Sequence, residues 1–148
     1  MAALDIAIQL ASGEASFHLS KGNVLYELKR YEEALTEYEQ ATRLTPNYAS
    51  AYYSMGNAYY CLKRYAESLA AFEHTIRIDP NYAYTYSGKS AALCGLKRYQ
   101  EALLVSERAI QLDPNLSHAY IVKSFALQGL GRSYEAEEAY RKGVQLGL

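Results

Sequence analysis

The sequence of 148 residues is poor in the residues that mark specialised protein classes, with two cysteines, three prolines, three phenylalanines and no tryptophan. Two cysteines cannot build a disulfide framework, which favours a reducing compartment. No apolar run approaches the roughly 20 residues of a membrane helix, and no secretory signal pattern opens the chain. The net charge of −1 provides no overall field for nucleic acid or an anionic membrane. We therefore predict a cytoplasmic location, with neither nucleic acid nor membrane as a partner.

One pattern stands out from this plain composition, because it recurs at a fixed interval of 34 residues. The octet "LKRYEEAL" begins at Leu28, "LKRYAESL" at Leu62 and "LKRYQEAL" at Leu96. The three prolines keep the same interval and are Pro46, Pro80 and Pro114. A fixed interval without insertions indicates that one structural unit is repeated along the chain.

Each proline directly follows Thr45, Asp79 or Asp113, which are residues suited to cap a helix. Proline ends a helix and also fits the first helical position, so we predict that each pair closes one helix and begins the next. Two helices of about 12–14 residues then lie between successive prolines, separated near the octet. Small residues recur at three positions of every unit, as a close crossing of two antiparallel helices requires. These positions are Gly22, Gly56, Ser90 and Ser124; Ala34, Ser68, Ala102 and Ala136; and Ala41, Thr75, Ala109 and Gly143.

A helix–turn–helix unit of 34 residues with these small, aromatic and proline positions resembles the tetratricopeptide repeat (TPR) family. The resemblance implies an all-α fold, a right-handed TPR solenoid. It divides residues 15–148 into four units, at 15–48, 49–82, 83–116 and 117–148. Residues 1–14 are either an N-terminal helix or the remnant of a preceding repeat. In the last unit Glu137 replaces the leucine of the other three, which predicts a polar terminal face.

By the same resemblance, one face of each first helix lines a concave groove. In this sequence that face is nearly uncharged and mixes Tyr, Ser and Asn with an apolar C-terminal end. Tyrosine offers a large rigid contact area, and asparagine can both donate to and accept from a peptide backbone. The residues that we predict to contact a peptide are Asn23, Tyr53, Asn57, Tyr60, Tyr84, Ser87, Ile121 and Phe125.

TPR co-chaperones that hold the C-terminal carboxylate of a heat-shock chaperone use two asparagines, two lysines and an arginine on three first helices. Transferred in register, those positions are Leu19, Asn23, Ser54, Tyr84 and Gly88 in this chain. Only Asn23 matches, and without the cations nothing offsets the desolvation of a carboxylate. We predict that this chain does not bind the carboxylate tail of a chaperone.

The basic residues of the octets and the residues that could act in catalysis have ordinary structural interpretations. The basic pairs of the octets, such as Lys63 and Arg64, are followed by glutamates, so we interpret them as a solvated edge. There is no glycine-rich phosphate loop, nucleophile elbow or metalloprotease motif in the sequence. We interpret Cys61 and Cys94 as free thiols. We predict no enzymatic activity, no cofactor and no metal.

The function that we predict is a non-enzymatic protein–protein interaction module, a scaffold or adaptor that binds an uncharged or apolar peptide segment in its groove. One alternative is a self-assembling TPR domain, a homo-oligomer formed through solenoid ends or grooves. Another alternative is that the chain is the TPR region of a larger enzyme.

Overall fold

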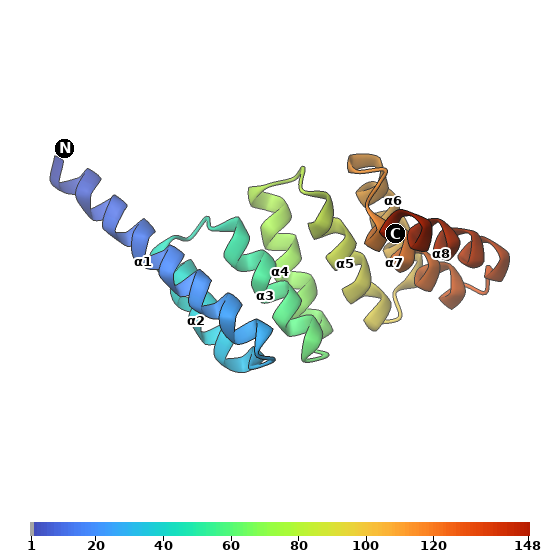
Figure 1. Ribbon diagram of the computed structural model, residues 1–148, viewed down its shortest axis with the longest axis horizontal. Helices are drawn as coiled ribbons and strands as arrows, with labels where there is room; N and C mark the ends of the chain where they lie inside the picture. The colour runs from blue at the N-terminus through green and yellow to red at the C-terminus, as the bar shows by residue number, and fades with distance from the viewer. Residues whose placement is uncertain (1) are drawn as a thin grey trace.

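The computed structural model describes residues 2–148, apart from the side chains of Ala2 and Ile8. Eight α-helices make up almost all of this segment, which contains no strand. They are α1 (Ala2–Glu27), α2 (Tyr31–Leu44), α3 (Ala49–Cys61), α4 (Tyr65–Ile78), α5 (Ala83–Gly95), α6 (Tyr99–Leu112), α7 (Ser117–Gly129) and α8 (Ser133–Gly147). Figure 1 shows them following one another in a row from α1 to α8. The predicted all-α solenoid is confirmed.

The helices pack as successive hairpins. Each odd-numbered helix packs most extensively on the even-numbered helix that follows it, and each hairpin then packs on the next one. The first helix differs from the others because it runs unbroken from Ala2 to Glu27, and its N-terminal half projects beyond α2 (Figure 1). We retain the four-unit division of residues 15–148 as an interpretation of these hairpins.

The repeated octet forms the turn inside each hairpin. Its lysine adopts a left-handed backbone conformation, with φ of 60° at Lys29 and 59° at both Lys63 and Lys97. The fourth unit has Gly131 at this position, with φ of 75°. A left-handed residue after a helix lets the next amides bond back to the last carbonyls, as the Arg64 amide does to the Tyr59 carbonyl at 2.9 Å. The turn therefore explains why glycine can replace lysine in the last unit.

The predicted helix starts at the proline segments are wrong. Helix α4 ends at Ile78 with Asp79 as its C-terminal cap, and α5 begins only at Ala83, after Tyr82. The Asp79 carboxylate instead accepts a hydrogen bond from the Asn81 amide at 3.1 Å, which closes a local turn. The equivalent helices α3 and α7 also begin three residues after their prolines, at Ala49 and Ser117. The proline segment is thus a short connection rather than a shared helix boundary.

The core lies where the two helices of a hairpin cross. Phe72 is 1% exposed, and its ring occupies the space left by Gly56 on α3 and Gly88 on α5, where an added Cβ would lie 2.6 Å from it. A side-chain hydrogen bond also joins the two helices at this crossing, because the Ser68 hydroxyl donates to the Gly56 carbonyl at 2.8 Å. In the next hairpin Ser90 donates to the Ala102 carbonyl at 2.7 Å. Because the residues at the crossing are small, the two helices approach closely enough for a serine hydroxyl of one to bond to a backbone carbonyl of the other.

No helix within residues 2–148 combines the length and the apolar character needed to cross a membrane.

Candidate functional site

A cavity of about 510 Å³ opens beside α5 and α7, and we call it the C-terminal cavity. Three of the predicted contact residues line it, namely Tyr60, Ile121 and Phe125. The exposed fraction is 41% for the Tyr60 side chain and 54% for Phe125, so both offer apolar surface to a ligand. No lysine, arginine or carboxylate is among the described residues that line this cavity. It is therefore suited to an apolar group rather than to an ion.

Two smaller adjoining cavities of about 380 and 270 Å³ lie between α1 and α3, and we call them the N-terminal cavities. Both are lined by Asn23 and Ser54, whose side chains bond to each other at 3.4 Å. Tyr53 lines the larger cavity and Asn57 the smaller one. The amides and hydroxyls of this region are suited to a peptide backbone, which needs both donors and acceptors.

A row of tyrosines leads away from the N-terminal cavities. The ring centroids of Tyr53 and Tyr82 are 5.4 Å apart in an edge-to-face arrangement, and those of Tyr82 and Tyr84 are 5.5 Å apart. Tyr82 and Tyr84 are exposed, whereas burial raises the pKa of the Tyr53 hydroxyl and keeps it neutral. This row presents uncharged aromatic faces and edges, which favours contact with apolar or proline-like side chains.

Ser87 does not belong to the accessible surface. Its side chain is fully buried, and its hydroxyl forms a 2.6 Å hydrogen bond with the Nδ1 atom of His118. Because α7 covers Ser87, its side chain is not accessible to a peptide, which is incompatible with the predicted contact. Its hydrogen-bond partner His118 lines the C-terminal cavity.

Sequence reasoning missed Cys94, Tyr99 and Gln128, which also line the C-terminal cavity. Tyr99 belongs to an octet, and its ring packs directly on Gly129. A Cβ atom added to this glycine would lie only 2.5 Å from the ring. Tyr65 contacts Gly95 in the same way one hairpin earlier. The signal that could have revealed this wall is the pairing of an octet tyrosine with a glycine 30 residues later.

Both cysteines are free thiols, as predicted, but they differ in environment. Burial in the C-terminal cavity wall raises the pKa of the Cys94 thiol to about 11, whereas Cys61 is exposed. Because the thiolate is the reactive form, we expect Cys94 to react with a maleimide at least about tenfold more slowly than Cys61 at pH 7.5. The Cys94 rate should keep rising as the pH approaches 11.

Rates measured separately on Cys61→Ser and Cys94→Ser variants provide the comparison, and both thiols should react alike in denaturant. Equal rates in the native protein would show that the cavity wall does not shield Cys94.

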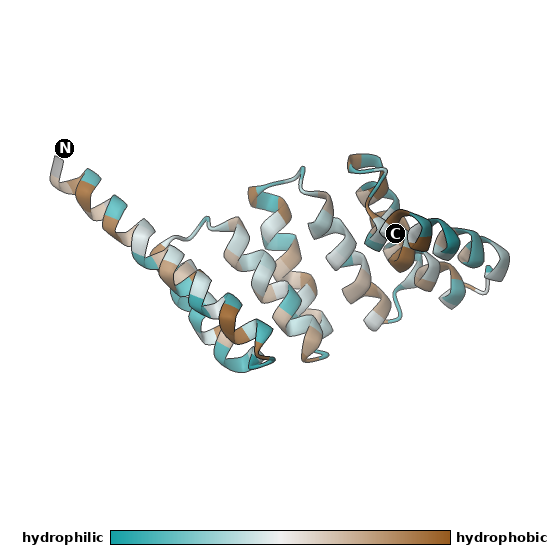
Figure 2. Ribbon diagram, in the orientation of Figure 1, coloured by the Kyte–Doolittle hydropathy of each residue, from teal (hydrophilic) through white to brown (hydrophobic). Residues whose placement is uncertain are grey.

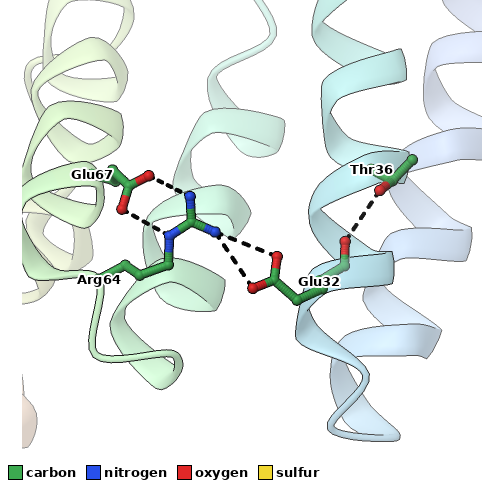
Figure 3. Close-up of polar contacts among 4 residues, drawn as sticks. All are labelled: Glu32, Thr36, Arg64 and Glu67. Carbon is green, nitrogen blue, oxygen red and sulfur yellow. Dashed lines mark hydrogen bonds and ion pairs between the residues drawn. The ribbon is translucent and has the colours of Figure 1, made fainter.

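The arginines of the basic edge are paired with glutamates, as predicted. Each octet arginine bonds to the glutamate three residues on, and Figure 3 shows Arg64 bonded to Glu67 and reaching Glu32 of the preceding hairpin. The Arg64–Glu32 distance is 3.4 Å, and the bond with Arg64 lowers the pKa of Glu67. The other pairs are Arg30–Glu33, Arg98–Glu101 and Arg132–Glu135. These pairs offset the arginine charge, so this edge is a solvated, mixed-charge surface instead of a phosphate-binding ridge.

Within residues 2–148, no three His, Cys, Asp or Glu side chains gather closely enough to hold a metal ion. The chemistry that the cavities offer is recognition through aromatic faces, amides and hydroxyls.

Stacked helical hairpins, with cavities lined by aromatic and polar side chains, define a helical repeat protein of the interaction-scaffold class. The profile of the TPR repeat matches residues 22–63, and profiles of the tetratricopeptide repeat match residues 49–82 and 117–146. Together these matches span more than half of the chain. The chain belongs to the tetratricopeptide repeat family, whose fold is generally a non-catalytic scaffold for protein interaction. Among curated proteins, no sequence matches this chain significantly.

Several solved structures share the fold. MamA from Desulfovibrio magneticus RS-1 has a TM-score of 0.79 at 26% identity, covering 90% of this chain and 75% of that chain. The first TPR of Spaghetti (RPAP3), bound to the HSP90 peptide SRMEEVD, has a TM-score of 0.78 at 26% identity, covering 81% and 95%. TTC0263, a thermophilic TPR protein of Thermus thermophilus, has a TM-score of 0.82 at 24% identity, covering 89% and 74%.

Proposed function

We propose that the concave surface of this chain binds an uncharged or apolar segment of a partner protein. The observation that carries this proposal is the composition of the cavities. The C-terminal cavity combines Tyr60, Ile121 and Phe125 in an uncharged lining, and the N-terminal cavities present Asn23 and Asn57 beside an aromatic row. Apolar anchors in one cavity and backbone-pairing amides in another are the two elements of peptide recognition.

Electrostatics favours this ligand over an acidic one. The formally charged side chains of the N-terminal cavities are those of Glu27 and Asp79, both acidic. An acidic peptide such as the one held by the RPAP3 domain would meet carboxylates here, with only Asn23 of the five predicted clamp positions matching. We therefore propose a neutral peptide, bound with little dependence on salt.

The contact residues that we propose are those the structure leaves accessible, which excludes Ser87. Tyr53 and Asn57 line the N-terminal cavities, and the exposed Tyr84 continues the surface from Tyr53 through Tyr82. Ile121 and Phe125 form an apolar anchor at the other end. A ligand that spans both would adopt an extended or helical path across α3, α5 and α7.

We expect a peptide-library selection on the protein to yield neutral sequences, which the triple variant Tyr53→Ala/Asn57→Ala/Tyr84→Ala does not bind. Truncating buried aromatic contacts weakens binding by about tenfold or more each, because they supply most of the contact energy. Dissociation constants measured by fluorescence anisotropy, at low and at high salt, provide the comparison.

A control is Leu104→Ala, which removes an apolar side chain that is 61% exposed on α6 and lines none of these cavities. It should bind peptides as the wild type does. Enrichment of acidic peptides would contradict the proposed neutral ligand. Binding that the triple variant retains would show that the peptide binds to another surface.

As part of this proposal, the protein acts as an adaptor in the cytoplasm, where its two thiols stay reduced. A self-assembling domain is the second candidate, and the exposed apolar side chains of α1, such as Leu10 and Phe17, favour it. A position within a larger enzyme remains the third alternative.

A further inference from the structure

A line of large apolar side chains runs along the outer face of α1, and Figure 2 shows hydrophobic residues in both halves of this helix. We call this line the α1 stripe. It consists of Ile6, Leu10, Phe17 and Val24 on α1 and of Leu28 directly after its end, with exposed fractions of 57%, 64%, 64%, 61% and 61%. The Leu28 amide still bonds to the Val24 carbonyl at 3.1 Å, so Leu28 continues the helical pattern. At 100° per residue, these side chains fall within about 40° of the helix circumference. Gly22, which packs on Tyr38 of α2, lies on the opposite side.

The α1 stripe is unlike the same face of the later first helices. At the positions equivalent to Phe17, those helices carry Ala51, Thr85 and Ala119, all fully buried beneath the preceding hairpin. At the positions equivalent to Val24 they carry Ala58, Ala92 and Ala126, which are also fully buried. Small residues are what lets a preceding second helix approach there. The α1 stripe is therefore shaped for a different neighbour.

The C-terminal helix of another copy does not fit either. Between hairpins, Lys89 pairs with Glu73 and Lys123 pairs with Glu107, both at 3.0 Å. If α8 packed on α1 in the same way, Arg141 would take the glutamate's position and would face Lys21. Glu137 would also replace the leucine that packs against the next hairpin. Like charges and a buried carboxylate disfavour such head-to-tail growth.

We propose that two copies of this chain associate through the α1 stripe as an antiparallel α1–α1 dimer, with Phe17 on the two-fold axis. The intervals along the stripe are 4, 7, 7 and 4 residues, so the pattern reads the same in both directions. An antiparallel copy therefore places Ile6 opposite Leu28, Leu10 opposite Val24, and Phe17 opposite itself. A two-fold interface requires such self-complementarity.

The charges beside the stripe match this arrangement. Glu14 and Lys21 lie along one edge of the stripe, and in an antiparallel pair this edge meets its own copy. With Phe17 on the axis, each Glu14 lies within about one residue of the level of Lys21 on the other copy. Lys21 already contacts Glu37 at 2.6 Å but is 52% exposed, and an ammonium can donate to two carboxylates. Two ion pairs thus fix the antiparallel direction.

The size of the stripe indicates a weak dimer. Five side chains that each expose roughly 100 Å² would bury on the order of 1,000 Å² between two copies, the lower limit for a specific interface. The projecting half of α1 would lie against the C-terminal half of the other α1. Such a dimer leaves the cavities open, so it does not depend on the peptide-binding proposal.

The first test is sedimentation equilibrium of the whole protein from micromolar to submillimolar concentration. We expect a monomer–dimer equilibrium without larger species, and a dimer dissociation constant that Phe17→Asp raises by at least about tenfold. Leu104→Asp places the same charge at an equally exposed position on α6 and should leave the dimer unchanged. Circular dichroism melting of each variant confirms that it folds.

The second test examines the two-fold axis itself. In a Cys61→Ser/Cys94→Ser background, Phe17→Cys should give a disulfide-linked dimer on addition of copper phenanthroline, whereas Leu104→Cys should not. A wild-type protein that stays monomeric, a dimer that Phe17→Asp does not weaken, or masses that grow beyond the dimer would each overturn the proposal. None of these results would bear on peptide binding, which is measured at low protein concentration.

Discussion

Replacing Phe72 with alanine is expected to lower the free energy of unfolding by about 3–5 kcal/mol, the range for a large side chain removed from a core. The Phe72 ring is 1% exposed and is shared by α3, α4 and α5 through Gly56 and Gly88. Its centroid also lies 5.8 Å from that of Tyr53. Because two glycines line the space, no neighbouring side chain can collapse into it easily, and the loss should lie near the upper end.

Denaturant unfolding of Phe72→Ala beside Phe125→Ala makes the comparison, since Phe125 is 54% exposed and loses little on truncation. We expect the first variant to unfold at a much lower denaturant concentration and the second to stay close to the wild type. If Phe72→Ala unfolds at the same denaturant concentration as the wild type, Phe72 does not stabilise the core by filling the space beside the two glycines.

The packing of Phe72 also shows how much of the fold the sequence predicts. Glycines on first helices pair with large rings on second helices 16 residues later, as at Gly22 with Tyr38 and at Gly56 with Phe72. A fixed repeat makes this complementarity visible, because both partners recur at the same interval. The helices, their pairing and the crossing points were therefore predictable from residue spacing alone.

The proline segments were not predictable in the same way. A threonine or aspartate before proline satisfies the rules for a helix start, yet the next helix begins only at Ala49, Ala83 or Ser117. The side chain of Asp113, for example, accepts a hydrogen bond from the Asn115 amide at 3.0 Å instead. Capping and turn formation use the same side-chain oxygen, so local sequence does not decide between them.

The candidate site was predicted in part for a related reason. The groove faces implied by the repeat family include Tyr60, Ile121 and Phe125, and the structure brings these three residues together in the C-terminal cavity. The assignment of faces failed for Ser87, which α7 covers, and it missed Tyr99 from the octet. Both errors arise from contacts between hairpins, which depend on how neighbouring units stack rather than on helical periodicity.

The second large effect is expected at the crossing of α5 and α6. Ala102 is fully buried, and its carbonyl accepts the Ser90 hydroxyl at 2.7 Å, so the two backbones approach closely there. A leucine at this position would force the helices apart or into strained rotamers. We expect Ala102→Leu to lower the free energy of unfolding by roughly 1–3 kcal/mol, as overpacking does in other cores.

The matched control is Ala70→Leu on α4, because Ala70 is an exposed alanine within the second helix of the preceding hairpin. It makes the same chemical change without entering a helix crossing, so its unfolding midpoint should stay near the wild-type value. Equal midpoints for Ala102→Leu and the wild type would show that residue 102 does not mark the crossing. A large loss in Ala102→Leu alone would extend the argument to Ala34, Ser68 and Ala136, because the repeat places them at the same crossing.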